Sequence, residues 1–567
     1  MRNLFFTILI VLPIVSLSQV ITTPPASSNL RAMAEWEEVQ ALTIAWTDYP
    51  AILKQIVAAG RLETEVIILS DDPASTEDYL LSTNTGGDAF ADLNNVTILE
   101  ADYNSIWMRD YAANPVYVNE VDSLFLVDWM YNRPRPADDA SPEVIADYLG
   151  LSLYATTEDP YDLRYTGGNY MSDGFGTAFA SELILNENDG TGDYNIVYPV
   201  HTESEINDIM NQFMGIETYI KMPALPYDGI NHIDMHMKLI DEETLLVGEY
   251  PEDIADGPQI NANIEYVLSN YESVFGTPYN VVRIPMPDSQ SGLYPDNGGS
   301  YRTYTNAVFV NNTIIFPTYR EEYDTTAFRI WGEVCPGYNL VGIDCDNQGN
   351  NIISLSGAIH CITHTVGVAD PLLISHNPLD DTYETVNPYA VTAHINHRSG
   401  IENGKIFWRY SGATDFNEIA MTELGENNWT GSIPAQPAGS VIEYYISGES
   451  ISGKVQQRPM PAPEGFWTFH ILGEVSSIEE NNVVSFGKIF PNPASSITCL
   501  EINNSIGNFS SIYLTDMAGR KVMDIYNGQL KSGLSKFFID ASTLSAGVYQ
   551  LVANNGHSVD VRNFMVK

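Results

Sequence analysis

Strand-like and helical segments alternate through residues 20–370, and this alternation constrains the fold more than any other feature of the sequence. Windows with helical periodicity cover residues 37–60 and 141–150. The strand-like runs around them are Glu65–Ser70, Asn195–Val200, Thr244–Tyr250, Asn280–Met286 and Thr313–Pro317. Short apolar runs that alternate with amphipathic helical windows predict an α/β domain over residues 20–370.

The helical periodicity ends near residue 370, and a β-rich region follows. Its apolar runs are Tyr389–Ile395, Lys405–Ser411, Ser440–Ser450 and Gly465–Leu472, separated by Gly, Asn and Pro. Several short strands at this spacing predict an immunoglobulin-like β-sandwich over residues 371–472. A polar stretch at 473–486 predicts a linker to a last segment, 487–567.

The first residues have the layout of a secretory signal peptide. Arg2 precedes an apolar run from Leu4 to Val15, and the small residues Ser16 and Ser18 follow. We expect residues 1–18 to be cleaved. An N-terminal membrane anchor is the alternative, although the run is shorter than the roughly 20 residues that span a bilayer. No later segment is apolar enough to span one, so we expect no transmembrane span after cleavage.

The chain is strongly acidic. It has 26 Lys and Arg against 73 Asp and Glu, a formal charge of -47 at pH 7. This charge repels nucleic acid and anionic membranes, so we expect neither as a partner. A cationic substrate would be attracted, although acidity also serves solubility alone.

Four cysteines occur in this secreted-looking chain: Cys335, Cys345, Cys361 and Cys499. An oxidising compartment permits disulfides, and Cys335 with Cys345, ten residues apart in a loop-like stretch, is the most plausible pair. That pairing would leave Cys361 free. By itself Cys361 could be a structural thiol, half of a disulfide, a metal ligand or a nucleophile.

Four clusters combine residue types that can do chemistry. They are "SIWMRDYAANP" with Trp107 and Asp110, "VDWMYNRPRPADD" with Asp128, Arg133 and Arg135, "NHIDMHMKL" with His232, Asp234 and His236, and "GAIHCITHTVG" with Cys361. The period-two spacing in the third predicts that its three side chains share one face of a strand. Taken singly, each cluster has another explanation. The first also fits core packing, the second a rigid exposed loop, the third metal ligands and the fourth a buried thiol.

Together the clusters favour one reaction. A cysteine nucleophile needs a neighbouring acid/base, usually histidine. Two carboxylates and an aromatic ring suit a planar guanidinium cation. The combination indicates thiol attack on a guanidinium carbon. Metal-dependent hydrolysis through His232, Asp234 and His236 is an alternative, but the HExxH and paired CxxC motifs of zinc sites are absent from the sequence. We therefore expect no metal and no cofactor.

Six motifs in order resemble the agmatine deiminase and bacterial peptidylarginine deiminase superfamily. They are "RAMAEWEEVQALTIAW", "WMRD", "TGGNYMSDGFGT", "HIDMHMKL", "YTNAVFVN" and "GAIHCITHTVG", spread over residues 30–368. The resemblance implies a five-bladed α/β propeller with the active site at its centre.

The resemblance also implies roles for particular residues. Cys361 would be the nucleophile, and His232, rather than His360 or His364, the general acid/base. Asp110 and Asp234 would bind the guanidinium. Asn306 would orient the nucleophile and the substrate, and Trp107 would form a wall of the pocket.

The substrate prediction depends on "NRPRP". This segment looks like the loop that binds the substrate carboxylate in secreted bacterial peptidylarginine deiminases, with Arg133 and Arg135 on the carboxylate and Asp128 near the substrate backbone. Thr166 stands where agmatine enzymes have an acidic residue. We expect peptides or proteins with C-terminal arginine as substrates. Agmatine, or no activity in a surface-binding protein, are the alternatives.

The last segment resembles the C-terminal sorting domain of the type IX secretion system. The resemblance rests on "FPNPASS", "DMAGRKV", "LSAGVYQL" and the terminal "FMVK". Its Pro-Asn-Pro edge, its Ala-Gly-Arg hairpin turn and the strand that follows Ala546-Gly547 predict a small β-sandwich. It implies contact with the type IX machinery and export through the periplasm and outer membrane, to the exterior or the cell surface.

Overall fold

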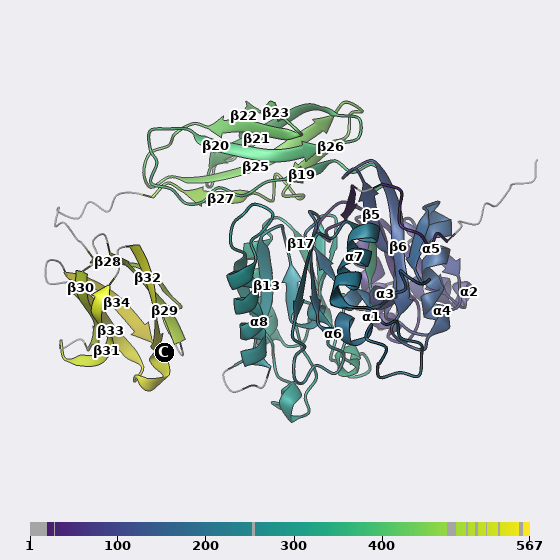
Figure 1. The fold of residues 1–567 in the computed structure, drawn as a ribbon, viewed down its shortest axis with the longest axis horizontal. Coiled ribbons are helices and arrows are strands. Elements are labelled where there is room, and N and C mark those ends of the chain that lie inside the picture. Colours follow the sequence, from purple (N-terminus) through teal and green to yellow (C-terminus); the bar gives the residue numbers. More distant parts are fainter. Residues whose placement is uncertain are drawn as a thin grey trace, which may run out of the picture. The chain divides into compact units, whose positions relative to one another are not determined.

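The computed structural model of the protein describes residues 20–472 except 28, 252–253 and 255, and residues 484–567 except 495–496, 505–507, 517–518, 531–532 and 555–558. The predicted signal peptide and most of the predicted linker lie outside these residues. The chain forms two compact units, Met1–Leu472 and Gly473–Lys567 (Figure 1).

Residues 30–367 form five small sheets rather than one large one. The first has the order β18-β2-β3-β4: His364–Gly367, Val39–Ala45, Glu65–Ser70 and Val96–Glu100. The second has the order β1-β5-β6-β7 with β8 beside β6: Leu30–Ala32, Asn114–Val118, Ser123–Tyr131, Leu153–Thr156 and Arg164–Tyr165.

The other three sheets have three strands each among the described residues. They are β11-β10-β9 (Thr218–Met222, Thr177–Ser181, Met171–Ser172), β12-β13-β14 (Met237–Leu239, Thr244–Glu249, Asn280–Pro285) and β15-β16-β17 (Val308–Val310, Thr313–Thr318, Asn339–Asp344).

Each sheet repeats one module, in which an antiparallel strand pair is followed by helical residues and then a parallel strand. In the first sheet the pair joins the two ends of the region, because β18 pairs antiparallel with β2, which is parallel to β3. The helices are α1 Pro50–Gly60, α2 Pro73–Leu80, α3 Met108–Tyr111, α4 Pro136–Asp139, α5 Ser141–Leu149, α6 Leu183–Asn186, α7 Glu203–Met214, α8 Gly257–Asn270 and α9 Glu321–Val334. The predicted α/β class is confirmed, and the parallel strands are reached by helical crossovers, as such strands require.

Two local predictions are wrong. The helical window at 37–60 is half strand, because β2 lies between two strands and its residues from Ala41 to Ala45 are all buried. A strand buried on both faces is a continuous apolar run, which periodicity cannot separate from a helix. The run Asn195–Val200 forms only an isolated bridge at Val200, and its Val197 and Val200 are 80% and 77% exposed.

Residues 373–470 form two antiparallel sheets that share one apolar core. The first has the order β19-β20-β24-β23: Leu373–Ser375, Tyr389–Asn396, Asn428–Ile433 and Thr422–Gly425. The second has the order β22-β21-β25-β26 with β27 beside β25: Asn417–Ala420, Ile401–Tyr410, Val441–Ser450, Val455–Arg458 and Trp467–His470. Buried and exposed residues alternate along β20, as expected of a strand with one face in a core.

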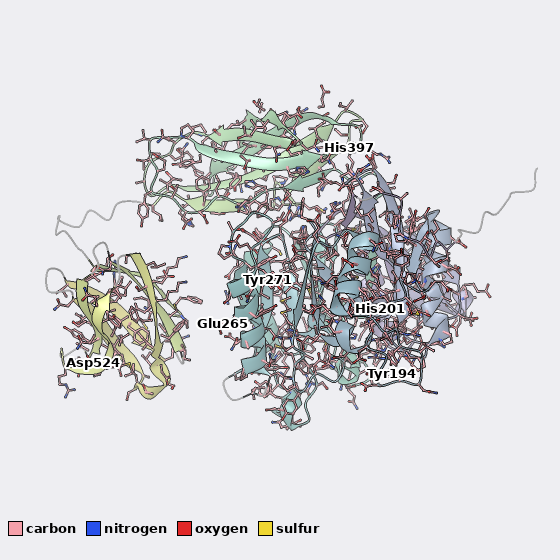
Figure 2. The ribbon with its side chains drawn as sticks, in the orientation of Figure 1. Tyr194, His201, Glu265, Tyr271, His397 and Asp524 are labelled. Carbon is pink, nitrogen blue, oxygen red and sulfur yellow. The ribbon has the colours of Figure 1, made fainter. Side chains whose placement is uncertain are left out.

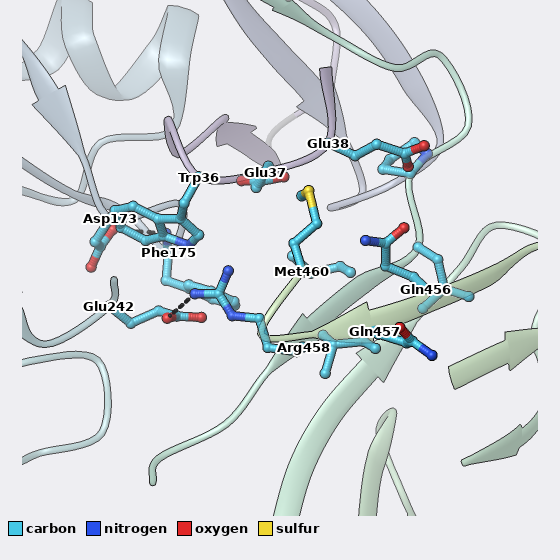
Figure 3. A pocket seen from close by; sticks show the side chains of 14 residues that line it. Trp36, Glu37, Glu38, Asp173, Phe175, Glu242, Gln456, Gln457, Arg458 and Met460 are labelled. Atoms are coloured by element: carbon cyan, nitrogen blue, oxygen red, sulfur yellow. Dashed lines mark hydrogen bonds and ion pairs between the residues drawn. The ribbon is translucent and has the colours of Figure 1, made fainter. Parts of the chain in front are cut away.

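The β region and the α/β region together line a groove beside Trp36, and side chains of the two regions contact each other there (Figure 3). Arg458 Nη2 lies 2.9 Å from Glu242 Oε2, and the same guanidinium lies 5.8 Å from the centre of the Trp36 ring. Lys454 Nζ lies 2.5 Å from Glu38 Oε2. These contacts hold the segment around Trp36 from outside.

The second unit is also built of two sheets around its own core. The strands are β28-β29-β32 (Val484–Phe490, Ile497–Asn504, Gly533–Asp540) and β31-β30-β33-β34 (Lys521–Leu530, Asn508–Thr515, Gly547–Asn554, Val559–Val566). Its architecture agrees with the small β-sandwich expected for this segment.

All four cysteines lie among the described residues, and all four are free. Cys335 follows α9 and Cys345 follows β17, and both thiols are buried. The predicted disulfide between them is therefore not formed.

We predict that the oxidised, secreted protein carries four free thiols. When it is unfolded without reductant and alkylated, intact-mass spectrometry should show four added groups. Two added groups, rising to four only after reduction, would instead demonstrate a disulfide.

Candidate active site

Residues from three sheets meet around Cys361. Cys361 lies in the turn between a 3-10 helix at Ile352–Leu355 and β18. Asp234 lies on a 3-10 turn, Ile233–Met235, just before β12, and Asn306 lies just before β15. The loops that precede the first strands of three modules therefore supply the central groups.

Asn306 holds the segment around Cys361 through hydrogen bonds. Its Nδ2 donates to Cys361 Sγ at 3.2 Å and to Asp234 Oδ2 at 3.1 Å. Its Oδ1 accepts from the backbone N–H groups of His360 at 3.0 Å and Cys361 at 3.4 Å. Cys361 is only 2% exposed, and its thiol lies 3.5 Å from Asp234 Oδ2. One amide thus fixes the thiol relative to the carboxylate.

His232 and Asp110 lie on the same site. His232 Nδ1 is 3.6 Å from Asp110 Oδ1, and both residues are buried. They come close because Gly168 lies against them: a Cβ there would be 2.4 Å from His232 Nδ1 and 3.0 Å from Asp110 Oδ1. Such distances are too short for any side chain, so a glycine is required at this position.

Several buried polar atoms of the site have no hydrogen-bond partner among the described residues. They are Asp110 Oδ1, Asp234 Oδ1 and both ring nitrogens of His232. Buried polar groups are nearly always paired. Two carboxylate oxygens and an imidazole left unpaired beside a thiol are complementary to a planar cation with several N–H donors.

The pKa shifts describe the resting protonation of the site. Burial, followed by the charges of Asp234 and Asp110, raises the pKa of the Cys361 thiol well above its usual value. Burial also lowers the pKa of His232, against the opposing charges of Asp110 and Asp234. At neutral pH the resting site therefore holds a neutral thiol and a neutral imidazole.

The expected strand with His232, Asp234 and His236 on one face is not formed. The residues Ile233–Met235 make a 3-10 turn, so strand periodicity does not apply. His236 is buried, and burial lowers its pKa to about 4. Among the residues that the structure describes, no group of three His, Cys, Asp or Glu side chains is arranged to hold a metal ion.

Sequence reasoning missed two residues, Glu35 and His360. His360 Nδ1 lies 2.8 Å from Asp234 Oδ2, and its Nε2 lies 2.9 and 3.0 Å from the two oxygens of Glu35. Glu35 also pairs with Lys238 Nζ at 2.6 Å. Glu35 stands within the motif "RAMAEWEEVQALTIAW" and His360 directly precedes Cys361, but neither position shows in the sequence that the two side chains meet.

Trp107 and Cys361 both lie against Gly357. A Cβ on Gly357 would lie 2.3 Å from the Trp107 ring and 3.2 Å from Cys361 Cβ, so Gly357 lets the indole approach the thiol. Asp128 is buried in β6, where burial and then the charge of Asp139 raise its pKa well above the usual range. No hydrogen bond or ion pair joins its side chain to Asp110, His232, Asp234 or Cys361 in the described part of the chain.

Arg133 and Arg135 follow shortly after the end of β6 at Tyr131. Arg133 Nη1 lies 3.8 Å from Glu187 Oε1, and its guanidinium lies 4.6 Å from the centre of the Tyr194 ring, which Figure 2 labels. Arg135 Nη1 donates to Ser105 Oγ at 3.2 Å and to Tyr131 Oη at 3.1 Å. The Tyr131 hydroxyl in turn lies 3.5 Å from Asp110 Oδ2.

Comparison with known proteins identifies two parts of the chain, the α/β region and the C-terminal unit. Residues 31–366 match the family model of the Porphyromonas-type peptidyl-arginine deiminase, and residues 488–567 match a secretion system C-terminal sorting domain. A relative from Shewanella sp. (strain W3-18-1), named "Putative agmatine deiminase", is 25% identical over 61% of this chain and 96% of its own length.

Two solved structures share the fold of the α/β region. A "putative peptidyl-arginine deiminase" is 19% identical, with a TM-score of 0.50 over 60% of this chain and 99% of the other. The agmatine deiminase of Enterococcus faecalis is 18% identical, with a TM-score of 0.50 over 62% of this chain and 99% of the other.

The sorting domain indicates export through the outer membrane. In the described residues no helix has the length and apolar character needed to cross a membrane. With more than half of its length matched by one family model around this thiol, histidine and carboxylate site, the chain belongs to the Porphyromonas-type peptidyl-arginine deiminase family.

Proposed function

We propose that the protein is an exported deiminase that hydrolyses the guanidinium of peptidyl-arginine, with C-terminal arginine preferred, to citrulline and ammonia. One observation carries this proposal: the unpaired Asp110 Oδ1 and Asp234 Oδ1 face a site that also holds the Cys361 thiol. A guanidinium pairs with two carboxylates through planar N–H donors and brings its carbon to the thiol.

The chemistry follows from these positions. Guanidinium binding neutralises the two carboxylates that raise the pKa of Cys361, so the thiolate becomes accessible. Sulfur adds to the guanidinium carbon, and the thiol proton leaves with ammonia through His232. Water activated by His232 then cleaves the C–S bond of the S-alkylthiouronium, which releases the ureido product and restores the thiol. Overall, a guanidinium and water give a urea group and ammonium.

The substrate carboxylate is assigned to Arg133 and Arg135. The positive charge of Arg133 contributes to the lowered pKa of His232, which supports a position for this arginine close to the proposed reacting groups. Arg135 lies one hydroxyl group away from Asp110. Arg133 and Arg135 could therefore bind the C-terminal carboxylate of an arginine substrate whose guanidinium lies between Asp110 and Asp234. We propose that Asp128 contacts the substrate backbone.

Two alternatives remain distinct from this proposal. Agmatine carries a guanidinium but no carboxylate, and the Shewanella relative named as an agmatine deiminase favours it. A surface-binding protein without activity is the other. The assembled set of Asp110, His232, Asp234 and Cys361 favours a working enzyme over it.

The architecture also supports the proposed five-bladed propeller. Five modules of the same strand order occur in sequence, and β18 returns to pair with β2, which joins the last module to the first. We propose domain boundaries at 20–370, 371–472 and 487–567, with the β region at 371–472 as an immunoglobulin-like domain.

We predict that Cys361→Ala abolishes turnover. With a peptide ending in arginine, the activity should fall below about 10⁻⁴ of wild type, because the nucleophile is lost. The assay measures ureido product and ammonia. Cys499→Ala, which changes a cysteine of the C-terminal unit, should keep full activity. No turnover by the intact, reduced wild type, or normal turnover by Cys361→Ala, would contradict the proposal.

We predict that Asp110→Asn speeds alkylation of Cys361 by neutral iodoacetamide while it abolishes deimination. The Asp110 charge raises the thiol pKa, so its removal lowers that pKa and increases the thiolate fraction at pH 8. One pKa unit is a tenfold change, so we expect about a 3- to 10-fold faster reaction. The exposed Asp147→Asn is the control. A slower reaction in Asp110→Asn would show that the carboxylate does not act on the thiol.

We predict that Arg133→Ala and Arg135→Ala each lower kcat/KM for C-terminal arginine by about 10- to 100-fold, the range for lost hydrogen bonds to a charged group. Agmatine and internal arginine should change by less than about threefold. Arg329→Ala, an exposed arginine on α9, is the matched control. Equal losses on all three substrates would mean that the loop does not bind a carboxylate.

A further inference from the structure

We propose that Glu35 and His360 are positioning residues of the deiminase reaction: His360, held between Glu35 and Asp234, fixes the Asp234 carboxylate so that one oxygen faces the thiol and the other faces the substrate cation. This inference rests on the proposed function, because it assumes that Asp234 binds a guanidinium.

The first support is the unequal use of the two Asp234 oxygens. Oδ2 accepts from His360 Nδ1 at 2.8 Å and Asn306 Nδ2 at 3.1 Å, and it lies 3.5 Å from Cys361 Sγ. Oδ1 has no hydrogen-bond partner among the described residues. A carboxylate rotates easily between equivalent positions when nothing distinguishes its oxygens. Here the contacts on Oδ2 direct Oδ1 toward the substrate side.

The second support is the environment of His360. Its side chain is fully buried, and each ring nitrogen faces a carboxylate. Ionised carboxylates only accept hydrogen bonds, so a neutral imidazole with one N–H could satisfy only one of them. The geometry therefore fits an imidazolium between two carboxylates. The positive charge and hydrogen bond of His360 keep the pKa of Asp234 below its usual value, although burial alone would raise it.

The third support is the setting of Glu35. Burial would raise its pKa, but the charges of His360, Lys238 and Arg109 hold it well below the usual range. Arg109 Nη2 lies 3.8 Å away. Glu35 also lines a small pocket with Arg109, Tyr170 and His364, whereas His360 and Asp234 do not line it. Glu35 is thus the outer end of a row of charges that begins at the site.

The N-terminal segment is itself held in place. Trp36, which directly follows Glu35, contacts Arg458 of the β region (Figure 3). Glu38, three residues after Glu35, pairs with Lys454 of the same region. These contacts therefore hold the backbone from which the Glu35 side chain extends. A fixed Glu35 orients the His360 ring, and the ring orients Asp234.

The test compares two His360 variants that each keep one half of the imidazole. Asn places an amide N–H near the position of Nδ1, so His360→Asn can still donate to Asp234. Gln reaches the position of Nε2, so His360→Gln can donate to Glu35 but not to Asp234. The readout is the ratio of two alkylation rates of Cys361, by the cationic 2-chloroacetamidine and by neutral iodoacetamide.

We predict that wild type reacts faster with the amidine than with iodoacetamide. His360→Gln should lower the ratio of the two rates by about 10- to 100-fold, because a charge-assisted hydrogen bond to Asp234 is lost. Glu35→Gln should lower it by about 5- to 10-fold, because the hydrogen bond to His360 is weakened. His360→Asn should keep the ratio within about threefold. The controls His394→Gln and Glu333→Gln, which change residues outside the site and outside the segment around Glu35, should match wild type.

The outcomes separate this proposal from the proposed function. Equal ratios in the Asn and Gln variants of His360 overturn the positioning role, because a merely structural histidine would not distinguish them. If neither variant folds, an unchanged ratio in folded Glu35→Gln overturns it instead. A third outcome is possible: the wild type deiminates no arginine compound, yet His360→Gln still lowers the ratio of alkylation rates. That outcome would support the positioning role and reject the proposed function.

Discussion

The buried Asp234 carboxylate is the interaction on which the rest of the site depends. Its side chain has no solvent exposure, and an unpaired carboxylate in that position would cost several kcal/mol. His360 and Asn306 compensate this cost through hydrogen bonds, and Lys238 through its charge. These groups lie before or within first strands of three different modules. The five-sheet region must therefore be assembled before the carboxylate can be ionised in place, which makes the site a property of the whole fold.

The same burial explains how a free cysteine can persist in an exported protein. The thiolate is the form that oxidises and exchanges with disulfides, and burial together with two carboxylates disfavours it at Cys361. A neutral reagent leaves this balance unchanged. In the proposed reaction a guanidinium would change it, because it would bring positive charge to Asp110 and Asp234. Protection of the thiol and preference for a cation would then both come from one electrostatic arrangement.

The sequence predicts the fold where periodicity is unambiguous and the site where motifs carry it. The runs at Glu65–Ser70 and Thr313–Pro317 and the alternating strand at Tyr389–Ile395 match strands of the structure. The prediction from sequence fails at β2, because a strand buried on both faces lacks the alternation of apolar and polar residues. It also fails at 195–200, where an apolar run pairs with no sheet and stays largely exposed. The strand expected at His232 is a 3-10 turn, because the chain there must bring His232 to Asp110 and Asp234 to Cys361. Glu35 and His360 could not be paired from sequence, since their contact depends on how the two ends of the region meet at β2 and β18.

The β region that follows the deiminase-like part also bears on the site. The family match ends at residue 366, before this region begins, yet Arg458 and Lys454 contact Trp36 and Glu38. Glu35, the residue directly before Trp36, contacts His360. A glutamate on an unsupported N-terminal segment would lose orientational entropy each time it met His360, and that loss would weaken the charge row. Contacts made before substrate arrives remove this cost, so the added β region contributes to the order of the site without supplying a group to it.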